Sequence, residues 1–223
     1  MTAAMAADSA PKRRLHLTEA HVARVERIEP EAPAARGLPY MEDADYLRQA
    51  QRLLAEAGDD PIWVFGYGSL IWKPAFDAVE AVPCLLHGWR RSFCLHLESW
   101  RGTPDEPGLM LALDRGWSCV GVAYRMPQDA PLERMLRLLQ RETTYHEDMP
   151  WQRWVTVRSG TERFRALAFW CAPSGPDADV LRLPVEEQAA WIARSVGFAG
   201  NGPEYLLNTV AHLEQHLGVA LFD

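Results

Sequence analysis

The sequence lacks the usual motifs of metal, redox and nucleotide-binding proteins. It has four cysteines, and no two of them are spaced as C-x-x-C, which argues against the common zinc and thiol-redox sites. The glycine motif Gly66-Tyr67-Gly68 lacks the third glycine of a dinucleotide fingerprint, and no Gly-Lys-Ser/Thr follows as in a phosphate loop. We therefore expect neither a metal nor an organic cofactor, and in particular neither NAD nor ATP.

An excess of basic charge and long apolar runs are also missing. The formal net charge is -7, from 23 Lys and Arg against 30 Asp and Glu, whereas nucleic-acid binders usually present a basic stripe. The short run Lys12-Arg13-Arg14 is typical of a solvated tail. No segment approaches the roughly 20 apolar residues of a membrane span, and no apolar stretch near the start suggests a signal peptide. We expect a cytoplasmic protein with no nucleic-acid or membrane partner; the oligomeric state cannot be predicted.

What is present is the composition of an ordinary soluble domain with an N-terminal extension. Hydrophobic residues make up 48% and charged residues 24% of 223 residues, which suits one domain and some additional chain. Residues 1–60 are expected to form an extension, with a disordered start at 1–14 and helices at 18–28 and 43–57. Thr18 is the expected N-cap of the first helix and Gly58 ends the second. The main domain is expected at 61–223.

The main domain reads as a mixture of strands and a few helices. A short apolar strand at 62–65 leads into the glycine turn. Further runs rich in β-branched and aromatic residues predict strands at 79–89, 92–98, 108–114, 118–125, 154–158 and 163–170. Helices are predicted at 131–144, 185–196 and 203–217. Many strands with few helices between them predict an α+β fold with a partly closed mixed sheet.

The segment Phe65-Gly66-Tyr67-Gly68-Ser69-Leu70 follows the first strand directly. Glycine permits backbone angles that other residues avoid and lets a ligand approach the main chain. Successive N–H groups in such a turn can form an anion-binding nest, and the Ser69 hydroxyl can donate or accept a hydrogen bond. The segment is therefore either a tight structural turn or the binding loop of a small carboxylate-bearing ligand.

Glu142 occupies an unexpected position on the helix predicted from Pro131. That helix has proline in its first turn and Asp129 as the expected N-cap. Glu142 lies seven residues after Met135 and three after Leu139, so it falls on the apolar stripe. A carboxylate buried there would have a raised pKa suited to proton transfer. Alternatively, the stripe has run out at the helix end and Glu142 is solvated.

Several ordered segments resemble the ChaC-type γ-glutamylcyclotransferases. The resemblance is found in Val64 to Trp72, Arg91-Ser92-Phe93-Cys94, Arg101-Gly102-Thr103 with Pro107-Gly108, Gly121 to Arg125, Arg141-Glu142, and Asn201 with Glu204-Tyr205-Leu206. Together these segments span about residues 61–217, and the long N-terminal extension resembles bacterial members of the family.

The resemblance implies a γ-glutamylcyclotransferase-like fold, a mixed β-barrel with flanking helices. It also implies a lyase of glutathione catabolism that cleaves glutathione to 5-oxoproline and cysteinylglycine without a cofactor. The implied binding residues are Phe65, Gly66, Tyr67, Gly68, Ser69 and Leu70, with Tyr205 lining the same pocket. Glu142 is the implied proton acceptor. Such chemistry needs no Ser–His or Cys–His pair, because the substrate's own α-amine is the nucleophile.

Other interpretations stay open. The enzyme could act on other γ-glutamyl amines or peptides, because no motif marks the residues that read the second half of the substrate. A non-catalytic module binding a small ligand is a further alternative, against which the presence of Glu142 argues. His212 and His216 have the i, i+4 spacing of a zinc-binding pair but lack a third ligand. Cys94 and His96 alternate along one strand, where we expect packing rather than a nucleophilic pair.

Overall fold

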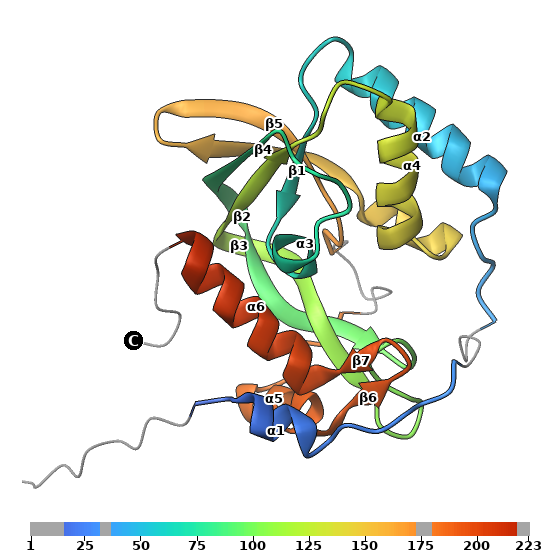
Figure 1. Ribbon diagram of the computed structural model, residues 1–223, viewed down its shortest axis with the longest axis vertical. Helices are drawn as coiled ribbons and strands as arrows, with labels where there is room; N and C mark the ends of the chain where they lie inside the picture. The colour runs from blue at the N-terminus through green and yellow to red at the C-terminus, as the bar shows by residue number, and fades with distance from the viewer. Residues whose placement is uncertain (1–15, 32–36, 173–179, 218–223) are drawn as a thin grey trace, which may run out of the picture.

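The computed structural model describes residues 16–31, 37–172 and 180–217, so the predicted disordered start at 1–14 lies outside the described residues. Figure 1 shows a curled sheet with helices around it. The strands are β1 (Trp63–Gly66), β2 (Glu80–Leu97), β3 (Gly108–Arg125), β4 (Arg153–Ser159), β5 (Glu162–Ala168), β6 (Val196–Gly197) and β7 (Gly200–Asn201). The helices are α1 (Glu19–Ala23), α2 (Asp43–Ala57), α3 (Ser69–Trp72), α4 (Pro131–Glu142), the 3-10 helix η1 (His146–Trp151), α5 (Val185–Arg194) and α6 (Gly202–Leu217).

Five strands close into a mixed barrel in the order β1-β3-β2-β4-β5. All neighbours are antiparallel except β1 and β5, which meet in parallel at Val64 and Leu167 and complete the closure. Hydrophobic side chains from every strand fill the interior, among them Phe65, Leu86, Leu113, Ala123, Val157 and Ala166. The predicted α+β fold with a mixed β-barrel and flanking helices is confirmed.

Two of the barrel strands are longer than the sequence predicts. The runs expected at 79–89 and 92–98 form one strand, β2, and those at 108–114 and 118–125 form β3. Register shifts between His87 and Trp89 and between Phe93 and Leu95 absorb the interruptions in the pattern. Gly88 has a positive φ of 80°, which glycine tolerates, so the strand bends there instead of ending.

Helices α2 and α4 lie side by side over the outside of the barrel (Figure 1). The predicted helix at 43–57 is confirmed at both ends, with Gly58 as C-cap at a φ of 64°. The two helices share a hydrophobic cluster with the barrel wall, which includes Ala50, Leu53, Met135, Leu138 and Leu167. Helix α2 of the N-terminal extension is thereby packed against the barrel.

Two local predictions are wrong. The helix expected at 18–28 is only α1, because none of its residues is buried and Ile28 is 98% exposed. Thr18 does precede it and takes part in a capping box with His21. The residue that caps α4 is Ala130, in a left-handed conformation, and not Asp129. The Asp129 carboxylate, one position too early, accepts a hydrogen bond from Arg134 at 2.6 Å instead.

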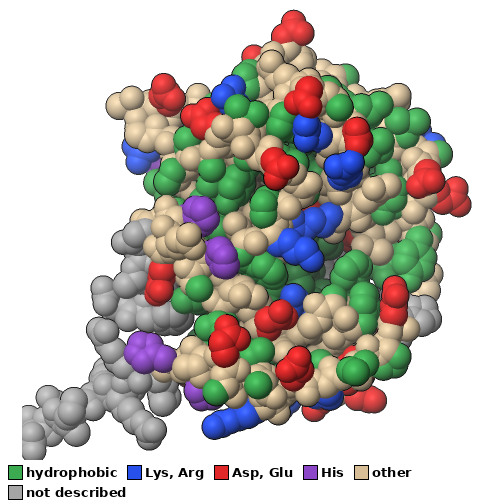
Figure 2. Space-filling view, in the orientation of Figure 1, with side chains coloured by type: hydrophobic (Ala, Val, Ile, Leu, Met, Phe, Trp, Pro, Cys, Tyr) green, Lys and Arg blue, Asp and Glu red, His purple; other side chains and the backbone are tan. Residues whose placement is uncertain are grey.

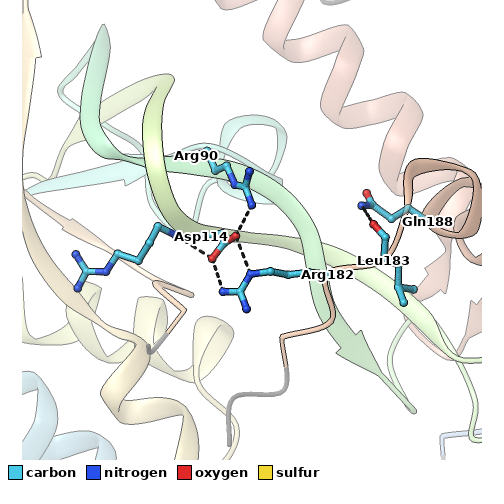
Figure 3. A network of polar contacts seen from close by, with 6 residues as sticks. Arg90, Asp114, Arg182, Leu183 and Gln188 are labelled. Carbon is cyan, nitrogen blue, oxygen red and sulfur yellow. Dashed lines mark hydrogen bonds and ion pairs between the residues drawn. The ribbon is translucent and has the colours of Figure 1, made fainter. Parts of the chain in front are cut away.

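A buried ion cluster fastens the segment before α5 to the barrel (Figure 3). Asp114 of β3 is 1% exposed and pairs with Arg90 of β2 at 2.7 Å and with Arg182 at 2.8 Å. The backbone N–H of Arg115 donates to the same carboxylate. These hydrogen bonds and charges lower the pKa of Asp114 to about 2 despite its burial.

Candidate active site

A cavity of about 620 Å³ opens beside one end of the barrel. Its wall is made by the end of β2 and the segment after it, the end of α4, η1, and the first turns of α3 and α6. Three of the residues singled out from the sequence line it, namely Ser69, Glu142 and Tyr205. Leu38, from the N-terminal extension, also lines it. The structure thus brings together side chains that are far apart along the chain.

The glycine turn is constrained by close approach of its neighbours. A Cβ on Gly66 would lie 3.0 Å from Cε2 of Tyr124, and one on Gly68 would lie 2.9 Å from the hydroxyl oxygen of Tyr205. Neither glycine has a positive φ. Glycine is therefore required here because two tyrosines press on the main chain.

Most side chains of the turn point away from the cavity. Phe65 is fully buried in the barrel and Leu70 lies in the cluster under the helices. The Tyr67 hydroxyl donates to the carbonyl of Phe169 at 3.1 Å. Of residues 65–70, only Ser69 lines the cavity. The turn therefore reaches the cavity at Ser69.

Arg91 holds this turn from the side. Its Nε donates to the Tyr67 carbonyl at 2.6 Å, and its Nη2 donates to the Val120 carbonyl at 2.7 Å. Sequence reasoning placed Arg91 in a family-like segment but gave it no role. A cation bound to two main-chain carbonyls, one in the turn and one in β3, leaves no periodic signal in a sequence.

Glu142 is the last residue of α4 and is only 8% exposed. It continues the buried stripe of Met135, Leu138 and Leu139, as the helical spacing predicts. Burial raises the pKa of its carboxyl group. The charge of Arg141, whose Nε lies 3.2 Å from Oε1, and a hydrogen bond from the Trp170 indole lower the pKa in part. The group is thus a buried acid that opens onto a cavity.

The end of α4 is fixed by the N-terminal extension. The Tyr46 hydroxyl of α2 donates to the carbonyl of Thr143 at 2.7 Å, and the Met41 N–H donates to that of Thr144 at 2.9 Å. These two carbonyls follow Glu142 directly in the chain. The extension therefore restrains the position of the carboxylate.

Tyr205 lies near the start of α6 and is 2% exposed. Its ring meets the edges of Trp72 and Phe93, with centroids about 6 Å apart. The Arg101 guanidinium lies 5.4 Å from the ring centroid. Burial raises the pKa of the phenol, so Tyr205 stays protonated and can donate a hydrogen bond.

Arg101, like Arg91, was assigned no role by sequence reasoning. Unlike Arg91, it lines the cavity. Its Nη1 donates to the Asn201 carbonyl and to Glu204, both at 2.8 Å. The Asn201 side chain in turn accepts from the Glu204 N–H at 2.8 Å. These contacts lock the first turn of α6, and with it Tyr205. The sequence signal that could have pointed to these residues was the resemblance of their segments to the ChaC-type family.

The two side-chain pairs weighed from the sequence do not form sites. Cys94 is fully buried at a register shift, and burial raises the pKa of its thiol. His96 instead packs near the Trp191 ring, with centroids 5.7 Å apart. A ring nitrogen of His212 lies 2.8 Å from the Asn208 carbonyl of its own helix. Within residues 16–31, 37–172 and 180–217, no cluster of three His, Cys, Asp or Glu side chains is placed to hold a metal.

The structure is a closed mixed barrel in which a buried acid lines a cavity of the size that suits a small molecule. Residues 62–221 match the family model described as ChaC-like protein, and the chain belongs to that family. It is 34% identical over 168 residues to the glutathione-specific γ-glutamylcyclotransferase of Escherichia coli K12, covering 75% of this chain and 70% of that protein. It is 31% identical over 160 residues to γ-glutamylcyclotransferase 2-3 of Arabidopsis thaliana, covering 69% and 80%.

A solved structure supports the fold. The crystal structure of a selenomethionine-labelled γ-glutamyl cyclotransferase specific to glutathione from yeast superposes with a TM-score of 0.58. The match covers 73% of this chain and 89% of that chain at 23% identity. The barrel and its helices are therefore those of the cyclotransferase fold.

Proposed function

We propose that the protein is a glutathione-specific γ-glutamylcyclotransferase, a lyase that converts glutathione to 5-oxoproline and cysteinylglycine. The observation that supports this most is the buried carboxylate of Glu142 on the wall of the cavity that Ser69 and Tyr205 also line. Family membership and the names of the relatives agree with it.

Glu142 is the proposed general acid and base. The α-amine of the γ-glutamyl group is mostly protonated at neutral pH, so its proton must leave before the nitrogen attacks the γ-carbonyl. Glu142 accepts that proton and the new C–N bond closes the five-membered ring. When the old amide C–N bond breaks, Glu142 returns the proton to the departing cysteinyl nitrogen. The second proton of the ring nitrogen then passes through the same carboxylate to that amino group, which leaves as an ammonium group. Atoms balance without water or a cofactor, and holding amine and carbonyl together supplies much of the rate.

The turn at 65–70 is the proposed holder of the γ-glutamyl group. Phe65, Gly66, Tyr67, Gly68 and Leu70 would act through main-chain N–H groups, since successive N–H groups of a glycine turn can form an anion-binding nest. Ser69 adds its hydroxyl. Tyr205, whose hydroxyl lies against Gly68, would donate beside the turn. Main-chain N–H groups aimed at the γ-carbonyl would also stabilise the developing oxyanion.

The charges of the cavity suit a zwitterion. Three cations line it, those of Lys73, Arg101 and Arg141, together with five carboxylates, those of Glu98, Glu142, Glu147, Asp148 and Glu204. Figure 2 likewise shows both signs of charge interspersed with hydrophobic side chains on one face of the molecule. Glutathione offers one ammonium and two carboxylate groups, so a wall of both signs matches it better than a basic pocket would.

We also propose the division into an N-terminal extension at 1–60 and a catalytic domain at 61–223. The extension would complete the cavity with Leu38 and restrain Glu142 through Tyr46. A cytoplasmic location is proposed from the cysteines, because all four are free and buried thiols. No helix in the described part of the chain is long and apolar enough to cross a membrane.

The test is a product assay with purified protein. Glutathione should yield 5-oxoproline and cysteinylglycine in equal amounts, and a γ-glutamyl amine without the cysteinylglycine half should yield far less. Product from the simpler γ-glutamyl amine, but not from glutathione, would instead favour the broader cyclotransferase. Binding of glutathione with no product from either compound would instead favour the alternative that the protein is a non-catalytic module that binds a small ligand.

A further inference from the structure

A second cavity, of about 590 Å³, lies at the seam between β2 and β4 and shares no lining residue with the candidate active site. The ladder between these strands has only two pairs, Leu85 with Arg158 and Leu86 with Val157. Beyond them β2 bends away at Gly88, where its register shifts. The cavity occupies the space that the bend leaves between the two strands.

Four arginines line this cavity: Arg115, Arg153, Arg158 and Arg163. No carboxylate lines it. In the described part of the chain, carboxylates pair with other arginines, as Asp114 does with Arg90 and Arg182, and none of the four is in an ion pair. An unneutralised group of four cations is notable in a chain with a net charge of -7.

The sheet register forces two of these cations together. Arg158 of β4 and Arg163 of β5 are direct cross-strand partners. Like charges directly opposite one another destabilise a sheet. Both side chains are exposed, so water and salt screen much of this repulsion, and an anion bound beside them would remove the rest.

The other two cations converge on one indole ring. The Arg115 guanidinium carbon lies 4.1 Å from the centroid of Trp89, and that of Arg153 lies 5.9 Å from it. The Arg153 Nε is buried and lacks a hydrogen-bond partner. Trp89 thus orients two guanidinium groups at the same cavity, while the strand pair supplies the other two.

We propose that this cavity binds a small polyanion that bears phosphate or carboxylate groups. Guanidinium groups recognise both chemistries by paired N–H donors, and four of them around one cavity favour a ligand with several negative charges. Binding would relieve the repulsion between Arg158 and Arg163. The site is independent of the proposed cyclotransferase reaction, since none of its residues takes part in it.

The test is calorimetric titration of the full chain at constant ionic strength with inorganic pyrophosphate and, separately, with citrate. We expect saturable binding of at least one, and the preferred ligand identifies phosphate or carboxylate as the chemistry. Arg158→Gln combined with Arg163→Gln should weaken that binding at least tenfold. Arg194→Gln, an exposed arginine on α5, is the control for loss of charge and should change binding less than twofold.

The proposal is overturned if neither anion binds saturably to the unmodified protein. It is equally overturned if the folded double variant binds as tightly as the unmodified protein, or if Arg194→Gln weakens binding as much as one of the two substitutions alone. Thermal unfolding checks that the variants fold. Turnover of glutathione by the double variant should be unchanged without added anion, so the outcome does not depend on the cyclotransferase assay.

Discussion

The hydroxyl oxygen of Tyr205 lies 2.9 Å from the position that a Cβ on Gly68 would occupy. The turn after β1 and the first turn of α6 are thus in direct contact, although 137 positions separate Gly68 from Tyr205 in the chain. Because Arg101 holds α6 in place, the turn has little room to move. The shape of the proposed binding loop therefore depends on a distant helix.

Gly68→Ala should distort this contact and lower turnover by at least tenfold, because the methyl group displaces either the turn or the tyrosine. Combining it with Tyr205→Phe removes the atom that the methyl group meets. The double variant should then unfold at nearly the same urea concentration as Tyr205→Phe alone. A double variant destabilised as much as the sum of the single changes would contradict the proposed contact.

The pH dependence of kcat/KM should report the ionisation of the Glu142 carboxyl group. As a base it must be ionised, so activity should fall as the pH drops through its raised pKa. Arg141 lowers that pKa, and Arg141→Gln should therefore move the acidic limb to higher pH. Arg137→Gln, on the exposed side of the same helix, is the matched control and should leave the limb in place. If the acidic limb of kcat/KM stays at the same pH in the Arg141 variant, the ionisation of Glu142 does not determine that limb.

Asp114→Asn should destabilise the fold by about 2 kcal/mol, because it removes the buried charge that Arg90 and Arg182 bind, while both arginine side chains are about half exposed and regain water. Urea unfolding measures this. The control is Glu133→Gln, which removes an exposed pair with Arg137 and should cost less than about 1 kcal/mol. Equal unfolding midpoints for the two variants would show that the cluster adds nothing to stability.

Acid should have a related effect on the unmodified protein. The pKa of Asp114 is lowered from 3.8 to about 2 in the folded state. Its contribution to stability is therefore complete above pH 3.8 and is lost as the pH falls towards about 2. The Asp114→Asn variant should lack this part of the acid dependence, which unfolding curves at a series of pH values would detect.

Local periodicity predicted those parts of the molecule in which one helix face meets the core. It located α2 to the residue and placed Glu142 on a buried stripe, because a 3.6-residue repeat reports directly on burial. It did not predict that β2 runs through Gly88, since a bulge interrupts alternation without ending the strand. It also extended α1 too far, because apolar spacing at Val25 and Ile28 does not guarantee a surface to pack against.

The long-range contacts of the candidate site leave no periodic pattern of apolar residues in the sequence. Arg91 and Arg101 act on main-chain carbonyls, and any residue type supplies a carbonyl, so the partner leaves no trace in the sequence. The resemblance to a family marked the segments but not their contacts. The catalytic and binding roles of Glu142, Tyr205 and the turn at 65–70 remain predictions.

The most direct measurement is single-turnover conversion of glutathione by Glu142→Gln. Glutamine keeps the size of the side chain but cannot accept the proton of the substrate amine. The variant should fold, should bind glutathione with an affinity within a few-fold of the unmodified protein, and should form 5-oxoproline at least 1,000-fold more slowly, a loss of about 4 kcal/mol in transition-state stabilisation. A variant that binds glutathione and retains most of its rate would contradict the assignment of Glu142 as the proton-transfer group.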